Sequence, residues 1–551
     1  MSRRIRRRLI IASLLVSTVF GIYAVKPNDN YFEISKNLEI FATLYRELNI
    51  FYVDDVQPGD MMKTGIDAML ESLDPYTNYI TESQIEDYRF MTTGQYGGIG
   101  SLIRTVDGDV YISEPYEGFP AQKAGLIAGD KILKIDGKPL EDKSQEEISK
   151  LLKGQSGTSL SITYERSGDK NEVELQREEI KIPDVPYYGM LNDEVGYIRL
   201  TSFTQTASKE VKEAFLELKS EKGMEKLVFD LRGNGGGLLR EAVNIVNFFV
   251  SKGQEVVSTK GRISEWEQTH KALNEPLDTE MPLVVLVDGG SASASEIVSG
   301  AIQDLDRGVV IGNRTFGKGL VQQTRDLQYN SKLKLTVAKY YIPSGRCIQK
   351  LDYSHKKKNG DVEEVPDSLL KVFETANGRK VIDGRGIDPD VEIEERELPH
   401  VLISLVSENL FFKYANEYFT QNSEIDEASE FELTDEEYNN FRDFLKDKEY
   451  SYITDTEKEL EKLKKIAQDE KYWGMAETEF ENLNDALKMK KNQDLMIFKD
   501  DITEVLKNEI VSRYYYQKGR IEATLASDEV VGEAKQVLAD ANRYEKILNP
   551  N

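Results

Sequence analysis

The sequence predicts a mixed α/β protein built from several domains, and three observations support this fold class. Short apolar runs rich in β-branched residues, such as 227–231 and Leu283–Val287, indicate buried strands. Near them lie stretches with apolar residues at helical spacing, such as 207–219. A chain of 551 residues is long enough for several domains, and its last part, 399–551, is almost entirely helical in pattern.

The composition excludes several classes of function. The net charge of −26 repels polyanions, which argues against a general nucleic-acid-binding role. The single cysteine, Cys347, excludes an internal disulfide framework and any metal site built from several cysteines. The three histidines, His270, His355 and His400, show no zinc-binding spacing, so we expect no metal or organic cofactor. We interpret Cys347 as structural, with a reactive thiol as the alternative.

The N-terminus carries a cluster of arginines followed by an apolar run at 9–25, the pattern of an export signal. The run is short for a membrane span, and Ala24 can end a cleavable signal. A signal peptide and a membrane anchor therefore both remain open for residues 1–26. Because arginines stay on the cytoplasmic side, the rest of the chain faces outward. We expect a periplasmic protein, anchored in the inner membrane by 9–25 if the signal is retained.

Residues 27–92 are expected to form a small helical N-terminal domain. Apolar residues recur at helical spacing over 31–52 and again over 61–70, which predicts two helices. The sequence Leu73-Asp74-Pro75 then ends the second helix, because proline cannot continue it.

Residues 93–180 read as a small module of strands around one helix. A glycine-rich loop that includes Gly98, Ile99 and Gly100 opens it. The predicted elements that follow are a strand at 101–105, a hairpin turn at Asp107-Gly108, a helix that begins at a capping box formed by Ser144 and Glu147, and strands at 159–165 and 172–176.

Residues 181–398 contain the longest apolar runs, so we expect the main core here. The strand at 227–231 enters a glycine-rich loop at 233–237, and a helix is predicted at 240–250. Glycines let the backbone approach another group closely and present its N–H groups. A tight turn between a strand and a helix is the alternative interpretation of this loop.

The stretch that carries the chemistry begins at Leu283–Val287. This strand is followed by a turn of small residues and a helix, and a serine in such a turn is placed to attack a carbonyl group. A serine needs a base, and no histidine lies in this stretch. Lys318, between Gly317 and Gly319, is the remaining candidate, because burial can lower a lysine pKa by several units from about 10.4. Taken separately, such turns and loops are common packing and surface features.

Together these pieces resemble the carboxyl-terminal processing proteases, also called tail-specific proteases. The sequence G-S-A-S-A-S-E-I followed by T-F-G-K-G-x-V-Q is similar to that family's pattern. The resemblance implies that Ser293 is the nucleophile, that Lys318 is its general base and that Gln322 positions the lysine. The pattern D-L-R-x-N-x-G-G-L-L is also similar, and it implies an oxyanion hole formed by the N–H groups of Ala294 and of Gly236 or Gly235.

The same resemblance implies a domain plan. It predicts a ClpP/crotonase-like peptidase core at 181–398 with an inserted PDZ domain at 93–180. In PDZ domains the glycine loop binds a peptide's terminal carboxylate, so Gly98, Ile99 and Gly100 would hold the C-terminus of a protein substrate. A PDZ fold that only packs or gates is the alternative.

The tail at 399–551 is rich in Glu, Lys and Asp and resembles the family only poorly. A capping box at Thr434 and Glu437 predicts one helix start, and Leu460 lies in a charged helical stretch. An aromatic cluster at 514–516 lies in another. Two interpretations remain open: helices that pair subunits or hold an adaptor or activator protein, and a solvated helical appendage.

We therefore expect a serine endopeptidase with a Ser-Lys dyad that cleaves cell-envelope proteins recognised by their C-terminus. Two other classes are weighed against it. A catalytically idle PDZ scaffold on the same fold has no chemical need for Ser293, Lys318 and Gln322 together. A crotonase-like acyl-CoA enzyme fits poorly with an export signal.

Overall fold

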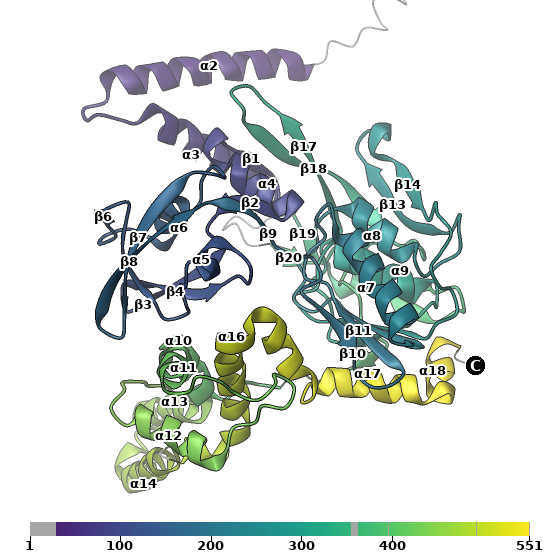
Figure 1. Cartoon of the computed structure of the whole chain (residues 1–551). Coiled ribbons are helices and arrows are strands. Elements are labelled where there is room, and N and C mark those ends of the chain that lie inside the picture. The colour runs from purple at the N-terminus through teal and green to yellow at the C-terminus, as the bar shows by residue number, and fades with distance from the viewer. Residues whose placement is uncertain (1–28, 354–361, 395, 492, 550–551) are drawn as a thin grey trace, which may run out of the picture. The chain divides into compact units, whose positions relative to one another are not determined.

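The computed structural model describes residues 29–353, 362–394, 396–491 and 493–549. The predicted export signal or anchor at 1–26 lies outside the described residues, and so does His355. No helix in the described ranges has the length and apolar character needed to span a bilayer. The chain divides into two compact units, one ending at Tyr79 and the other beginning at Ile80 (Figure 1).

The first unit contains the two helices that the sequence predicted, α2 (Asp29–Phe51) and α3 (Pro58–Glu71). The hydroxyl of Tyr45 donates a hydrogen bond to the carbonyl of Pro58 at 2.7 Å, which joins one helix to the start of the other. The apolar row of α2 faces solvent within this unit, and the Phe32 side chain, for example, is 74% exposed.

In the second unit, the PDZ-like module is an antiparallel sheet of order β3-β4-β5-β7-β8, with β6 beside β5. The strands β2 and β9 pair in a separate two-stranded sheet. The predicted hairpin turn joins β3 to β4, with φ of 53° at Asp107 and 85° at Gly108. The predicted capping box is also present, since Glu147 accepts the N–H of Ser144 at 2.8 Å. The elements are α4 (Ile85–Thr93), β2 (Gln95–Gly98), β3 (Ser101–Val106), β4 (Asp109–Pro115), α5 (Pro120–Lys123), β5 (Lys131–Ile135), β6 (Lys138–Pro139), α6 (Gln145–Leu152), β7 (Ser159–Arg166), β8 (Asp169–Gln176) and β9 (Glu178–Lys181).

The core is built on a central sheet of order β10-β11-β12-β15-β16-β23, in which β10 is antiparallel and the other strands are parallel. Parallel neighbours need crossover connections, and helices provide most of them here. One face of the sheet packs on α7, α8 and α9. The elements are β10 (Tyr187–Met190), β11 (Val195–Arg199), α7 (Ala207–Glu221), β12 (Lys226–Asp230), α8 (Leu239–Val246), β15 (Leu283–Val287), α9 (Ala294–Asp304), β16 (Val309–Gly312) and β23 (Val391–Glu392).

A second sheet holds β13 (Glu255–Gly261), β14 (Gln268–Lys271), β17 (Leu320–Asp326) and β18 (Lys332–Tyr341). The strands β17 and β18 form a long hairpin that leaves the core directly after the Lys318 loop. Short strand pairs at β19 (Leu351–Asp352) with β20 (Glu363–Glu364), and at β21 (Val372–Glu374) with β22 (Lys380–Ile382), complete the region.

The tail has two parts. Helices α10, α11, α12, α15 and α16 surround a core of their own, and the predicted helix start at Thr434 is confirmed by its capping box with Glu437. The aromatic cluster at 514–516 lies in α16, where Tyr516 breaks the helical geometry with φ of 53°. The elements are α10 (His400–Ser407), α11 (Leu410–Gln421), α12 (Asp435–Leu445), α13 (Asp455–Asp469), α14 (Trp473–Lys491), α15 (Asp494–Ile497), α16 (Lys499–Leu525), α17 (Glu529–Ala539) and α18 (Ala541–Leu548).

The end of the tail is part of the core. Helices α17 and α18 (yellow in Figure 1) cover the second face of the central sheet, where Val531 and Val537 pack in one cluster with Val284 and Leu286. Tyr544 adds hydrogen bonds to the backbone of Leu283, as a donor to the carbonyl and an acceptor from the N–H. The interpretation of the whole tail as a solvated appendage is therefore wrong, because these side chains lie in a shared apolar core.

Candidate active site

The turn after β15 presents a strained serine. Asp288 accepts hydrogen bonds from the N–H groups of Gly290 and Ser291 at 2.9 and 3.0 Å, which folds the chain back after the strand. Ser293 then has φ of 57° and ψ of −109° and caps the N-terminus of α9. A positive φ is strained for a residue with a side chain, and such strain is typical of functional turns between a strand and a helix.

A fully buried carboxylate joins this turn to the Lys318 loop. The Oε2 atom of Glu296 accepts the backbone N–H of Ser293 at 2.8 Å and that of Lys318 at 2.9 Å. Its Oε1 atom accepts the hydroxyl of Thr315 at 2.6 Å and the N–H of Gly317 at 2.7 Å. Two segments that are separate in sequence therefore share one carboxylate, and the backbones of Ser293 and Lys318 meet at the same oxygen.

The hydrogen bonds also indicate the charge of Glu296. Burial raises the pKa of this carboxyl, and its four hydrogen bonds oppose that effect. The Thr315 hydroxyl accepts the N–H of Ile387 at 2.7 Å and donates its own proton to Glu296. Every partner is a donor, which matches an ionised carboxylate whose two oxygens only accept.

Tyr340, on β18, is a second link between the two segments. Its side chain is 1% exposed, and its hydroxyl oxygen lies 3.0 Å from the carbonyl oxygen of Ser293. The same hydroxyl contacts the carbonyl oxygen of Lys318. A phenol has one proton, so it donates to one carbonyl at a time while staying within reach of both.

Gln322 lies on β17, the strand that follows the Lys318 loop. Its Nε2 atom donates a hydrogen bond to the hydroxyl of Thr336 on β18 at 3.2 Å. A β-bulge between Val321 and Gln322 changes the register at this point. The role of Gln322 in orienting Lys318 stays a prediction.

The glycine-rich loop at 233–237 lies against the serine turn. A Cβ atom added to Gly236 would lie 2.7 Å from the carbonyl oxygen of Ala292, 2.8 Å from Cβ of Ser293 and 2.9 Å from the nitrogen of Ala294. Only glycine fits there, and its φ of 99° also favours glycine. The loop therefore brings its backbone to the N–H of Ala294, as an oxyanion hole requires.

Gly236, one of the two alternatives for the second oxyanion donor, already makes a hydrogen bond through its N–H. The N–H of Gly236 donates to the side-chain oxygen of Asn234 at 2.9 Å. Gly236 must therefore share or release this hydrogen bond in order to hold an oxyanion, and Gly235 remains the alternative.

Asn234 fastens the loop to its surroundings. Its side chain is fully buried and donates to the carbonyl of Leu200 at 2.8 Å. The backbone carbonyl of Asn234 accepts the N–H of Ala292 at 3.0 Å and the hydroxyl of Ser295 at 2.8 Å. These bonds hold the loop and the serine turn as one piece.

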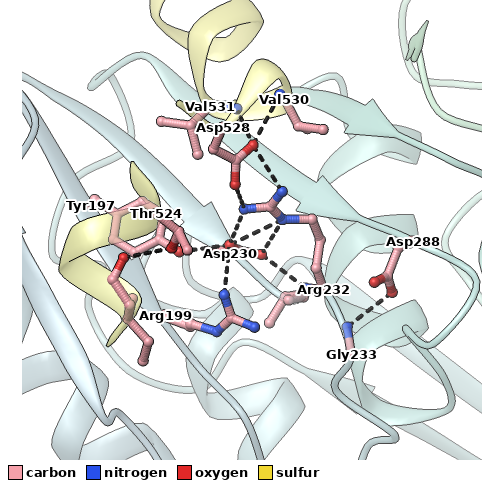
Figure 2. Close-up of polar contacts among 12 residues, drawn as sticks. Tyr197, Arg199, Asp230, Arg232, Gly233, Asp288, Thr524, Asp528, Val530 and Val531 are labelled. Carbon is pink, nitrogen blue, oxygen red and sulfur yellow. Dashed lines mark hydrogen bonds and ion pairs between the residues drawn. The ribbon is translucent and has the colours of Figure 1, made fainter. Parts of the chain in front are cut away.

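A network of charges lies at the start of the same loop (Figure 2). The fully buried carboxylate of Asp230 accepts the hydroxyl of Tyr197 at 2.6 Å and the guanidinium of Arg232 at 2.7 Å. Arg199 lies 3.8 Å away, and Arg232 also pairs with Asp528 at 2.7 Å. Burial alone would raise the pKa of Asp230, but the attraction of Arg232 outweighs it and holds the pKa below its usual range.

In the PDZ-like module, packing accounts for several glycines. A Cβ atom at Gly100 would lie 2.4 Å from Cβ of Phe119, and one at Gly98 would lie 2.6 Å from the ring of Tyr96. Ile99 as a whole is 2% exposed, and its carbonyl accepts the N–H of Ala121 at 2.8 Å. Gly98 and Gly100 are buried as well, so the role of this loop in holding a peptide stays a prediction.

The described histidines are not partners of the serine. His270 lies on β14, and His400 begins α10 and contacts Asp455 at 3.2 Å. Neither makes a hydrogen bond with Ser293. No cluster of three or more His, Cys, Asp or Glu side chains suited to a metal ion occurs among the described residues. Burial raises the pKa of the Cys347 thiol, which matches a structural role.

Several residues of the site were not found by sequence reasoning. Glu296 follows Ser293 by three positions, so the spacing of a capping box could have drawn attention to it. Asn234 is the asparagine of the D-L-R-x-N-x-G-G-L-L pattern, so the motif could have pointed to it as well. Tyr340 carries no comparable signal, since it acts through contacts that only the folded chain creates.

Comparison with known proteins extends these observations. A sequence profile described as Peptidase family S41 matches residues 194–354, and one described as a PDZ domain matches 111–166. A third, described as the C-terminal helical domain of a probable PDZ-protease, matches 401–538.

Curated relatives match over most of their own length. The chain is 38% identical to the carboxy-terminal-processing protease of Bartonella bacilliformis over 57% of this chain and 73% of that protein. It is 35% identical to a probable CtpA-like serine protease of Staphylococcus aureus over 62% of this chain and 69% of that protein.

Solved structures show weaker likeness. The photosystem II D1 C-terminal processing protease is 28% identical, with a TM-score of 0.35 over 65% of this chain and 93% of that chain. A putative S41 protease from Bacteroides fragilis is 16% identical, with a TM-score of 0.38 over 68% of this chain and 94% of that chain.

Proposed function

Because the chain belongs to the carboxy-terminal-processing proteases, which are serine-type peptidases, we propose that Ser293 and Lys318 form the catalytic dyad of an endopeptidase. The observation that supports this assignment most strongly is the shared carboxylate of Glu296. It accepts the backbone N–H groups of both residues and so holds a strained serine next to the lysine loop.

The proposed reaction is acyl transfer to serine followed by hydrolysis. Neutral Lys318 accepts the proton of the Ser293 hydroxyl as its oxygen attacks a peptide carbonyl. The N–H of Ala294 and that of Gly236 or Gly235 stabilise the negative oxygen of the tetrahedral intermediate. Lys318 then gives the proton to the leaving amine, and a water molecule hydrolyses the acyl-enzyme. Gln322 is proposed to orient the lysine.

We propose that the PDZ domain selects the substrate by its C-terminal tail. The backbone of Gly98, Ile99 and Gly100 would hold the terminal carboxylate, and the edge of β3 would pair with the peptide. The arginine cluster and apolar run before residue 26 support an exported enzyme acting on cell-envelope proteins. The tail helices α10 to α16 would be the part available to an adaptor or to a second copy of the chain.

The test is cleavage of an unstructured polypeptide that ends in an apolar residue. We expect the wild-type protein to cut it and the Ser293→Ala and Lys318→Ala variants to be inactive. Lys350→Ala is the matched control, because this lysine lies beside the Lys318 loop but its ammonium pairs with Glu364 at 2.9 Å. Equal cutting by all variants would remove the dyad from the mechanism, and no cutting by any of them would favour a catalytically idle PDZ scaffold.

A further inference from the structure

We infer that Asp528, in the C-terminal helical region, is a positioning residue for the oxyanion loop. The inference rests on the proposed function, because it concerns the loop that presents Gly235 and Gly236. It gives the tail a part in catalysis beyond docking or assembly. Figure 2 shows the carboxylate of Asp528 facing the guanidinium of Arg232, the residue that enters the loop.

The contact between the two residues has a fixed geometry. Two nitrogens of Arg232 donate to the two oxygens of Asp528, at 3.1 and 2.7 Å. A paired contact of this kind sets the plane of the guanidinium as well as its position. The side chains are only 16% and 17% exposed, so water competes weakly for these bonds. One terminal nitrogen of Arg232 donates to Asp528, and the other donates to both Asp528 and Asp230.

Asp528 is itself held in place. Its Oδ1 atom caps α17 by accepting the N–H groups of Val530 and Val531, both at 3.0 Å. Val531 is fully buried in the cluster that joins α17 to the central sheet. The carboxylate therefore cannot move without the helix, and it acts as a fixed point against which Arg232 is aligned.

The side chain of Arg232 is joined to the backbone of the loop through Asp230. Its N–H and its side chain bind the same carboxylate, that of Asp230, with the N–H at 2.9 Å. The next residue, Gly233, donates its N–H to Asp288 at 2.9 Å. Asp288 also folds the serine turn through the N–H of Ser291. The entry to the loop is thus fixed between the Asp528 network and the turn that carries Ser293.

Loss of the Asp528 charge would leave Arg232 and Arg199 facing one carboxylate. The guanidinium would keep its bonds to Asp230 but lose the paired contact on its outer edge, so the entry to the loop would be held less firmly. A small displacement of an oxyanion donor reduces the stabilisation of the transition state far more than it weakens the binding of a substrate. The turnover number kcat should therefore fall while KM stays near its wild-type value.

The informative variant is Asp528→Asn in the full chain. Asparagine caps a helix about as well as aspartate, so α17 should be retained while the charge is lost. The matched control is Asp540→Asn, because Asp540 caps α18 through the N–H of Arg543 at 3.0 Å and is not part of this network. Cleavage of the same unstructured polypeptide gives kcat and KM, and thermal melting monitors folding.

We expect Asp528→Asn to lower kcat by about tenfold to a hundredfold with KM changed by less than about twofold. Asp540→Asn should leave both unchanged. Arg232→Lys keeps the charge but lacks the paired geometry, so it should give a similar loss. The double variant Asp528→Asn/Arg232→Lys should lose little more than Arg232→Lys alone, because that change already breaks the contact with Asp528.

Unchanged kcat in Asp528→Asn would overturn the inference. The inference would also be overturned if KM rose in proportion to the loss of activity, if Asp540→Asn lost as much activity, or if the effects added in the double variant. Each of these results would assign Asp528 to binding or folding. If Asp528→Asn melts below the assay temperature, the same comparison of kcat with KM is made on Arg232→Lys, in which kcat should fall while KM stays near its wild-type value. Full activity of Ser293→Ala would instead refute the proposed dyad, whatever Asp528 does.

Discussion

Glu296→Gln is the substitution that examines the site most deeply. The carboxylate accepts four hydrogen bonds, from the N–H groups of Ser293, Gly317 and Lys318 and from the hydroxyl of Thr315. A glutamine keeps one accepting oxygen and replaces the other with an NH₂ group, which donates. Whichever way the amide points, two of the four donors lose their acceptor.

The size of the effect follows from that count. A hydrogen bond to a charged group contributes about 1.5–3 kcal/mol, so losing two costs about 3–6 kcal/mol. Removing a buried charge recovers part of this, because the ionised group was costly to bury. We expect the free energy of unfolding to fall by about 3 kcal/mol. We expect kcat to fall at least about a hundredfold, because in either orientation the Lys318 loop loses at least one of the bonds that hold it against the serine turn.

Denaturant unfolding measures the first quantity and polypeptide cleavage the second. The matched control is Glu241→Gln, because Glu241 is also a buried glutamate in the first turn of a helix. It accepts two bonds from Ser208, away from the serine turn. The control should lose stability but keep its kcat. The reasoning is refuted if Glu296→Gln retains kcat within about twofold of the wild type, or if both variants lose kcat equally.

Three further results are expected. The pKa of Asp230 lies below its unfolded value, so its stabilisation is complete above about pH 4 and is lost as the pH falls further. Asp230→Asn should therefore flatten the acid side of the stability curve, and an unchanged curve would contradict this. Burial raises the pKa of Cys347, so the native thiol should react with a disulfide reagent at about pH 8 more than tenfold slower than the unfolded chain; equal rates would show an accessible thiolate. Finally, a substrate with an amidated C-terminus should raise KM without changing kcat, and an unchanged KM would remove the loop at Gly98–Gly100 from recognition.

Local rules predicted much of the fold. The strands β12 and β15 and the capped helices α6 and α12 were found because each depends on a short stretch of sequence. The packing of α17 and α18 on the central sheet was not found, since it joins Val284 to Val531, which lie far apart in the sequence. Charge density made the tail look solvated, although one apolar face of these helices is buried.

The residues of the candidate site also differ in how far the sequence could predict them. Ser293, Lys318 and the glycine loop lie in recognisable motifs, so sequence reasoning could propose them. Glu296 and Asn234, which hold them together, lie in the same motifs. Two further groups do not, because Tyr340 comes from another sheet and Asp528 from the tail. A charged residue in a helical tail has no local feature that marks it as part of an active site.

The most direct test of the dyad is the site of a covalent adduct. Wild-type protein, Ser293→Ala, Lys318→Ala and the control Lys350→Ala would be treated with a fluorophosphonate probe, and the modified peptide would be identified by mass spectrometry. We expect the adduct on Ser293 in the wild type and in Lys350→Ala, much slower labelling in Lys318→Ala and none in Ser293→Ala. An adduct on another serine, or equal labelling rates with and without Lys318, would contradict the Ser-Lys mechanism.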